Sequence, residues 1–327
     1  MSQNSVVNLQ MSANSNNQGR AYEFVCLQSL YEAIASLRRA EIVRNSSYDA
    51  AESAWNTLSA TDKTLYTLSA KSTIDTIFAM EPNIVERTSD MLRLYIQTDK
   101  HGEEADVRDI IIERADIVWE IGLSIKHNHM AVKHSRLSKD IDFGEKWYGV
   151  SCSQQYWDNV SPIFSFLAKE KEKGTYFRDL ESKEELVYVP LLQSFMQEIK
   201  VGIDKDSIVP RKLVEYLLSK YDFYKIVSVD SKRVTTIQSF NMFGTLNQAS
   251  KVKKPDIIVP VIELPTELLY IGFKKNSKTT VLMSFDNGWQ FSFRIHNAED
   301  RVNTSLKFDI QIIGMPVDVN IKYNCKW

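Results

Sequence analysis

The stretch that decides the fold of this chain occupies residues 102–139 and has the sequence GEEADVRDIIIERADIVWEIGLSIKHNHMAVKHSRLSK. A first strand opens with acids and continues through the isoleucines at 110–112, and a turn is expected at 114–116. Over 117–126 apolar and polar residues alternate, so one face of a second strand belongs in a core and the other is polar as far as Lys126. The pattern predicts a hairpin, followed by a loop and a basic helix.

An acid near the head of one strand and a lysine at the end of its partner suit phosphodiester hydrolysis. Carboxylate oxygens hold Mg²⁺, and a bound metal can activate water and neutralise the charge that builds on a phosphate. A lysine at the same point can orient or deprotonate that water, or stabilise the pentacovalent phosphate. An amphipathic hairpin with solvated charges has the same spacing, so spacing alone does not choose between the two interpretations.

Five segments together resemble the HaeIII type II restriction endonuclease family: GRAYE at 19–23, NSSY at 45–48, the 102–139 stretch, KLVEYLL at 212–218 and FRIHNA at 293–298. The longest continuous piece is WEIGLSIKHNHMAVKHSRLSKDIDFGEKWYG at 119–149, which is far more specific than a short motif. The resemblance implies an α/β (α+β) fold with a PD-(D/E)XK nuclease core, in which helices flank a mixed sheet, and the residues beyond Pro255 add a β-rich C-terminal part. It also implies Mg²⁺-dependent cleavage of double-stranded DNA at the palindrome GGCC, and a companion DNA methyltransferase.

The chain departs from the usual core motif of that superfamily, in which an acid stands two positions before the lysine. Here that position is Ser124, and Glu120 is the nearest acid on the face of Lys126. The six residues from Glu120 to Lys126 span roughly 20 Å of extended strand at about 3.3 Å per residue, too far for one metal ion unless the strand bends at Gly122. We therefore expect a second carboxylate from elsewhere. Glu23, on the expected first helix, is the preferred donor, with Glu103 and Glu104 as alternatives.

Two aspartates compete for the role of the first acid. A tight turn at 114–115 sets Asp106 level with Leu123 or Ser124 and Asp109 level with about Glu120, because antiparallel partners have a constant sum of positions. Asp109, however, leads directly into the apolar run, which is the usual place for the aspartate of the resembled family, and a wider loop would bring it level with the lysine. Both Asp106 and Asp109 stay candidates.

Composition places the chain among ordinary globular proteins. It has 327 residues, enough for a sizeable core, and a net charge of −2, so DNA contact requires segregated basic residues. Cys26, Cys152 and Cys325 have no metal-ligand spacing, and their odd number indicates a reducing compartment. We expect a cytoplasmic protein, because no run is apolar enough to cross a membrane and no export signal is present.

Periodicity and breakers divide the chain into three regions: a disordered tail over 1–19, an endonuclease core over 20–245, and a β-rich region over 255–327 that packs on the core and helps to recognise DNA. Helices are expected over 20–40, 186–200 and 211–220, with one or two more over 47–80. Strands are expected at 92–97, 224–229, 257–261, 268–273, 279–285, 290–295, 306–313 and 317–323, with a hairpin turn at 286–288.

Two groups of polar residues are candidates for DNA contact. The first follows the hairpin, where basic side chains suit phosphates: His127, Asn128, His129, Lys133, His134 and Arg136. The second lies on and after the strand at 290–295: Arg294, His296, Asn297 and Arg301. Arginine is shaped for a bidentate contact to guanine, which suits the implied target, although pairing with a carboxylate of the protein is equally consistent with the pattern.

Two functions therefore stand beside each other. The first is a Mg²⁺-dependent, site-specific endonuclease acting on double-stranded DNA, for which a palindromic target suits a homodimer. The second is a catalytically inactive DNA-binding protein on a nuclease-like fold, which Ser124 favours and Lys126 with its neighbouring acids opposes.

Overall fold

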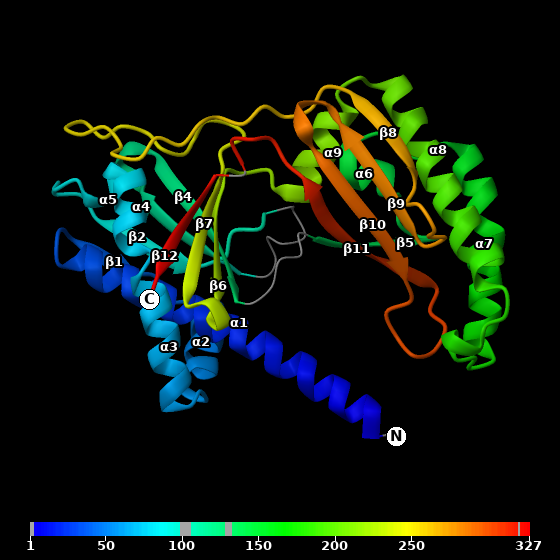
Figure 1. Ribbon diagram of the computed structural model, residues 1–327, viewed down its shortest axis with the longest axis horizontal. Helices are drawn as coiled ribbons and strands as arrows, with labels where there is room; N and C mark the ends of the chain where they lie inside the picture. Colours follow the sequence, from blue (N-terminus) through cyan, green and yellow to red (C-terminus); the bar gives the residue numbers. More distant parts are fainter. Residues whose placement is uncertain (1–2, 99–105, 128–132, 320) are drawn as a thin grey trace. The chain divides into compact units, whose positions relative to one another are not determined.

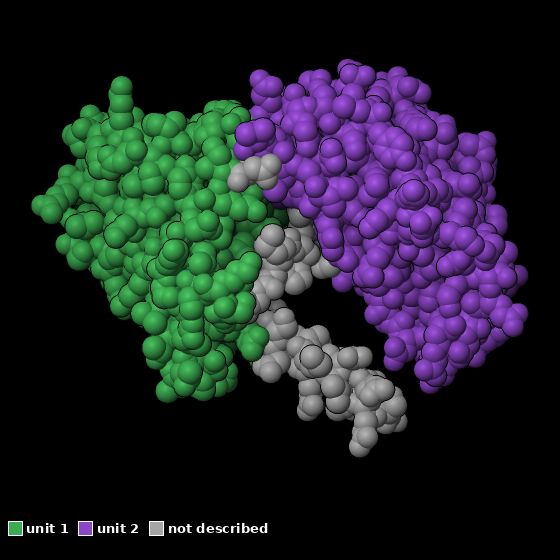
Figure 2. Space-filling view, in the orientation of Figure 1, with its two compact units in different colours: residues 1–130, 220–262, 318–327 green, residues 131–219, 263–317 purple. Residues whose placement is uncertain are grey.

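The computed structural model describes residues 3–98, 106–127, 133–319 and 321–327. The chain forms two compact units (Figure 2). Unit 1 comprises Met1–Met130, Lys220–Ile262 and Asp318–Trp327, and unit 2 comprises Ala131–Ser219 and Glu263–Val317. The expected division between 245 and 255 differs from this one, because each unit is assembled from separated segments of chain.

Unit 1 is built on a seven-stranded sheet with the order β1-β2-β3-β4-β6-β7-β12 (Figure 1). Its strands are Ala40–Ile42, Leu92–Ile96, Ile110–Arg114, Trp119–His127, Phe223–Val229, Val234–Phe240 and Lys322–Lys326, respectively. β1 pairs with β2 in parallel and β4 with β6 in parallel, while the other pairs are antiparallel. The sheet is therefore mixed, and helices accompany it, which confirms the expected fold class.

Helices of unit 1 cover one face of this sheet. They are α1 (Gln3–Ala35), α2 (Ser46–Asn56), α3 (Ala60–Lys71), α4 (Ile74–Met80) and α5 (Pro82–Val85). Their buried side chains form one core with Ile121, Leu123 and Ile125 of β4. Since successive strand residues point to opposite faces, Glu120, Ser124 and Lys126 lie on the face away from that core. α1 begins at Gln3 rather than near residue 20, and the 46–80 region holds three helices rather than one or two.

The β3–β4 hairpin has a wider connection than a tight turn. Residues Ala115–Ile117 form a short 3₁₀ turn, and Val118 closes it with a left-handed φ of 52°. The register pairs Ile110 with Leu123 and Arg114 with Trp119. Of the two registers left open for this hairpin, the tight-turn register is therefore wrong. The wider loop sets Asp109, not Asp106, level with Ser124.

Unit 2 has a five-stranded antiparallel sheet with the order β5-β11-β10-β9-β8. Its strands are Lys133–Ser138, Ser305–Gly314, Gln290–His296, Thr280–Phe285 and Leu268–Phe273, respectively. The basic helix expected after the hairpin is wrong, because this segment is the strand β5. Buried Ser135 and Leu137 alternate there with exposed Arg136, and β5 pairs with β11, a partner far away in sequence.

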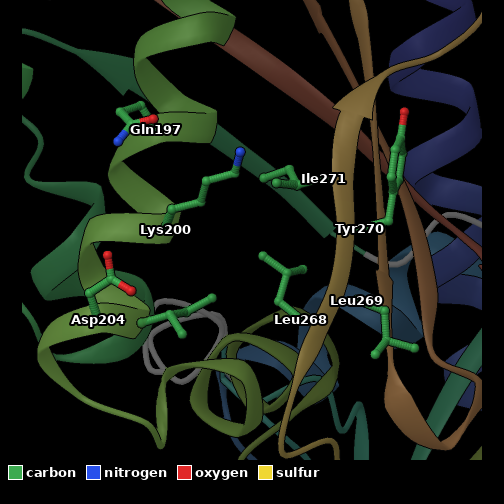
Figure 3. A pocket seen from close by; sticks show the side chains of 8 residues that line it. Gln197, Lys200, Asp204, Leu268, Leu269, Tyr270 and Ile271 are labelled. Atoms are coloured by element: carbon green, nitrogen blue, oxygen red, sulfur yellow. The ribbon is translucent and has the colours of Figure 1, made fainter.

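The helices of unit 2 are α6 (Phe143–Tyr148), α7 (Gln154–Glu172), α8 (Val189–Lys205) and α9 (Val209–Leu218). A cavity of about 520 Å³ lies between α8 and the edge strand β8, with Lys200 and Asp204 on one side and Leu268 and Ile271 on the other (Figure 3). None of the residues expected for catalysis lines it. Among the described residues, no helix combines the length and apolar character that crossing a lipid bilayer requires.

Most expected C-terminal strands are present. The turn at Asp286–Gly288 is confirmed, with positive φ at Asn287 and Gly288. No strand forms over 257–261. The strand expected at 317–323 lies instead at Lys322–Lys326 as β12, and it joins the sheet of unit 1 by pairing with β7.

Candidate active site

Asp109 and Lys126 meet where β3 and β4 emerge from the centre of the unit 1 sheet. The backbone of Asp109 is held between two strands, since its carbonyl accepts from the Gln97 amide at 2.9 Å and its amide donates to Leu123 at 2.8 Å. Its carboxylate oxygen Oδ2 accepts from the Ile125 amide at 2.6 Å and from Lys126 Nζ at 3.0 Å. The pair is thus fixed by the register of the hairpin.

This ion pair is accessible rather than sealed in a core. The Lys126 side chain is 31% exposed and that of Asp109 is 22% exposed. Burial lowers the pKa of the Lys126 ammonium, but the Asp109 carboxylate, with a smaller effect from Glu23, outweighs it and holds the pKa above its usual value. Lys126 is therefore a cation at neutral pH, suited to charge stabilisation at a phosphate.

Glu23 approaches the same pair from α1. It is half-buried, and its carboxylate is close enough to raise the pKa of Lys126. Cys26, one helical turn further along α1, responds to the same acids: burial raises the pKa of its thiol, and the charges of Glu23 and Asp109 raise it further. The helix thus brings a second carboxylate into the neighbourhood of Asp109, where Ser124 offers only a hydroxyl, 3.4 Å from Asp109 Oδ2.

Asp106 and Glu120 belong to a different cluster. Arg108 binds Asp106 through its backbone amide, Nε and Nη2, with an Nη2–Oδ2 distance of 2.8 Å, and its Nη1 lies 2.7 Å from Glu120 Oε1. The Arg108 guanidinium also lies 4.0 Å from the ring centre of Tyr221. Both acids therefore neutralise an arginine, and the structure does not bring either to Lys126.

Gly122 explains how Arg108 reaches across β4. A Cβ built on Gly122 would lie 1.9 Å from Arg108 Cδ, so any side chain there would displace the arginine. The pairing of β3 with β4 continues through Ile111 and Gly122 without a register shift. The glycine thus makes room for an ion-paired arginine, and the strand does not bend there to bring Glu120 towards Lys126.

The donor groups at this site suit Mg²⁺. Among the described residues there is no group of three histidine, cysteine or acidic side chains that could hold a metal. Mg²⁺ does not need one, because it is commonly bound through one or two carboxylates, with water and substrate phosphate filling its other positions. The hydrogen bonds of the Asp109 carboxylate all go to Oδ2, so no described donor occupies Oδ1. Asp109 and Glu23 fit that pattern.

The first group of expected DNA-contact residues is divided. His127 is a packed side chain, 7% exposed, with Nε2 at 2.8 Å from Asp230 Oδ2 and Nδ1 at 3.3 Å from the Tyr66 hydroxyl. Asn128 and His129 lie outside the described residues, as do the side chains of Lys133 and His134. Arg136 is exposed on β5, where it donates to Ser305 Oγ at 3.0 Å.

The second group lies in unit 2. Arg294 is 59% exposed and lies 3.3 Å from Asp309 Oδ2. His296 is half-buried, and burial, followed by Arg294 and Lys307, lowers the pKa of its imidazole. The Asn297 side chain bonds backbone groups of Glu299, Arg301 and Asn303, which shapes the loop.

Arg301, from the same group, donates to the Gly174 carbonyl and lies 4.6 Å from the ring centre of Tyr176. Arg294 and Arg301 are both exposed.

Sequence reasoning missed Lys225. It pairs in register with Ser124 across the parallel β4–β6 contact, so it shares the face of Lys126. Burial, followed by the charges of Lys126 and Lys322, lowers the pKa of the Lys225 ammonium to about 8. The strand at 224–229 was expected, but its parallel pairing with β4 leaves no local mark in the sequence.

Comparison with known proteins identifies the family of this chain. The sequence model of the HaeIII restriction endonuclease family matches residues 19–316. The Type II restriction enzyme HaeIII of Haemophilus aegyptius is 52% identical over 310 residues, which cover 94% of this chain and 97% of that enzyme. The comparison with solved structures gave no match. The two sequence matches show that the chain belongs to the HaeIII restriction endonuclease family, a family of site-specific deoxyribonucleases.

Proposed function

We propose that this chain is a type II restriction endonuclease that hydrolyses double-stranded DNA at a short palindrome with the help of Mg²⁺. The family resemblance suggests GGCC as the target. The observation that carries the proposal is the partly exposed Asp109–Lys126 pair, 3.0 Å apart on the face of the sheet away from the helices of unit 1. An inactive DNA-binding protein would need neither this pair nor a second acid beside it.

In the proposed mechanism, Asp109 and Glu23 would hold Mg²⁺, and the bound ion would supply water activation and neutralise charge on the phosphate. The Asp109 carboxylate is oriented for this by the Ile125 amide and Lys126, both of which donate to Oδ2. Lys126 places its ammonium at the reacting phosphate, where it stabilises the added negative charge. Ser124 takes the place of the missing acid without supplying charge.

The proposal extends to the biological setting. A palindromic target suits two copies of the chain related by a two-fold axis, so a homodimer is included. A companion DNA methyltransferase and a cytoplasmic location follow from membership of a restriction system. Arg294 is the proposed guanine-reading side chain, since Arg301, the other arginine expected for this role, is held by the Gly174 carbonyl and the Tyr176 ring.

The test is a plasmid digestion with and without Mg²⁺, followed by sequencing of the fragment ends. Discrete fragments that appear only with metal and share one palindrome at their ends would support the proposal. Intact plasmid together with a gel shift would favour the inactive DNA-binding alternative. Discrete fragments with another end sequence would support the endonuclease function and contradict GGCC as the target.

A further inference from the structure

The face of the unit 1 sheet that carries Asp109 and Lys126 continues into a groove over β6, β7 and β12. The groove has a volume of about 440 Å³, and its lining includes Lys225, Lys232, Lys322 and Lys326 and, among the described residues, no acidic side chain. Valines and other uncharged side chains of the three strands make up the rest of the lining. We call this surface the lysine groove.

Strand register connects the lysine groove to the candidate active site. Lys126 on β4 pairs with Val227 on β6, Val227 pairs with Thr236 on β7, and Thr236 pairs with Asn324 on β12. Residues paired in this way point to the same face. Three steps between neighbouring strands, at about 4.8 Å each, cover about 14 Å from Lys126, roughly the axial rise of four DNA base pairs.

Three of the four lysines of the groove, Lys232, Lys322 and Lys326, make no ion pair with any described residue. Repulsion between the lysine charges affects Lys225. Burial lowers the pKa of its ammonium most, and the charges of Lys126 and Lys322 lower it further. Such a concentration of cations, in a chain whose net charge is −2, is complementary to a polyanion.

Protection of the sheet edge does not account for the whole groove. Exposed lysines on an edge strand prevent unwanted strand pairing, which would explain Lys322 and Lys326 on β12. Lys225, however, lies on β6, inside the sheet, and Lys232 lies in the Asp230–Lys232 turn that joins β6 to β7. Neither position borders an open edge, so these two charges serve another purpose.

We propose that the lysine groove binds the sugar–phosphate backbone of DNA next to the cleaved phosphate. This inference rests on the proposed function, because the groove would bind the part of the DNA strand that extends beyond the cleaved phosphate. The lysine ammonium groups contact phosphate oxygens as point charges. Val227, Val229 and Val234 give the sugar carbons an apolar floor. The contacts read no base, so they increase affinity for target and random DNA alike.

The test is the salt dependence of DNA binding by the full chain in EDTA, where no cleavage occurs. The variant Lys322→Gln/Lys326→Gln removes two groove charges while keeping polar side chains on the edge strand. The matched control is Lys63→Gln/Lys71→Gln on α3. That helix packs on the opposite face of the sheet, where Ser69 bonds Ser228 and Thr235. Fluorescence anisotropy with a target duplex and a random duplex gives the dissociation constants from 50 to 200 mM KCl.

The groove variant should lower the slope of log affinity against log salt by about 2, since each lost phosphate contact contributes about 0.9. Its affinity for both duplexes should fall roughly tenfold at 100 mM, because one exposed ion pair is worth only a few-fold. The control should keep the wild-type slope. An unchanged slope in the groove variant, or an equal loss in the control, would overturn the inference.

The result is separable from that of the plasmid digestion. Cleavage by the wild type together with an unchanged slope would contradict DNA binding by the lysine groove and would support the endonuclease function. Absence of cleavage together with a reduced slope would contradict the endonuclease function and would support DNA binding by the lysine groove.

Discussion

Replacing each of two neighbouring aspartates by asparagine should separate catalysis from stability. Asp106→Asn and Asp109→Asn remove the same charge three positions apart. The Asp106 side chain is 5% exposed and is bound by Arg108, itself 8% exposed. Breaking a buried ion pair costs about 3–5 kcal/mol. Because the amide keeps one acceptor oxygen and Arg108 keeps Glu120, we expect a loss of about 2–3 kcal/mol in the free energy of unfolding.

Asp109→Asn should have the opposite profile. Its carboxylate is more exposed, and an exposed ion pair is worth at most about 1 kcal/mol, so the unfolding free energy should change little. Cleavage should fall at least ~100-fold, the cost of losing a group that acts in the transition state. DNA affinity should stay or rise, because a negative charge beside the phosphate is removed.

The assays are urea unfolding followed by circular dichroism, single-turnover cleavage with Mg²⁺, and DNA binding in EDTA. A stable Asp106→Asn variant that no longer cuts, beside an active Asp109→Asn variant, would refute the assignment. Normal cleavage by both variants would show that the hairpin does not form the active site.

Three further substitutions test individual residues. Glu23→Gln should reduce Mg²⁺-dependent cleavage and raise the Mg²⁺ concentration needed for half-maximal rate; an unchanged metal titration would return Glu23 to a purely structural role on α1. Burial raises the pKa of Glu81 from 4.5 to about 7, although the Tyr224 hydroxyl donates to it at 2.5 Å. Because the folded state holds this proton more tightly than the unfolded state, stability is fully present below about pH 4.5 and falls by up to about 3 kcal/mol as the pH rises through 7. Glu81→Gln should flatten urea-unfolding stability between pH 5 and 8, and a flat wild-type profile would contradict the assignment. Arg294→Ala should weaken binding to the target duplex by about 1–3 kcal/mol more than binding to random DNA at one fixed salt concentration; an unchanged ratio would move base reading to another residue.

The β3–β4 hairpin could be predicted because its signal is local. Alternation around Trp119 and Ile121 identifies the buried face, and Lys126 follows from the same period of two. The register could not be predicted, because it depends on the left-handed φ of Val118, a residue with no preference for that conformation. One turn residue therefore decided which aspartate lies beside the lysine.

Long-range pairing limited the remaining predictions. The segment at 133–138 carries basic residues that suit a helix, but pairing with β11 makes it a strand. Lys225 was invisible as a site residue, since only the parallel contact with β4 brings it beside Ser124. Arg108 was overlooked because its position depends on the space beside Gly122. In that position it forms ion pairs with Asp106 and Glu120.

The central claim is that the ammonium of Lys126 acts on the cleaved phosphate. Its most direct test is the single-turnover rate of Lys126→Ala with Mg²⁺ on a duplex that carries one target, with Lys71→Ala as the control. The claim predicts a loss of at least ~100-fold in the rate, with DNA affinity and urea stability close to those of the wild type. Cleavage at the wild-type rate by Lys126→Ala would contradict it.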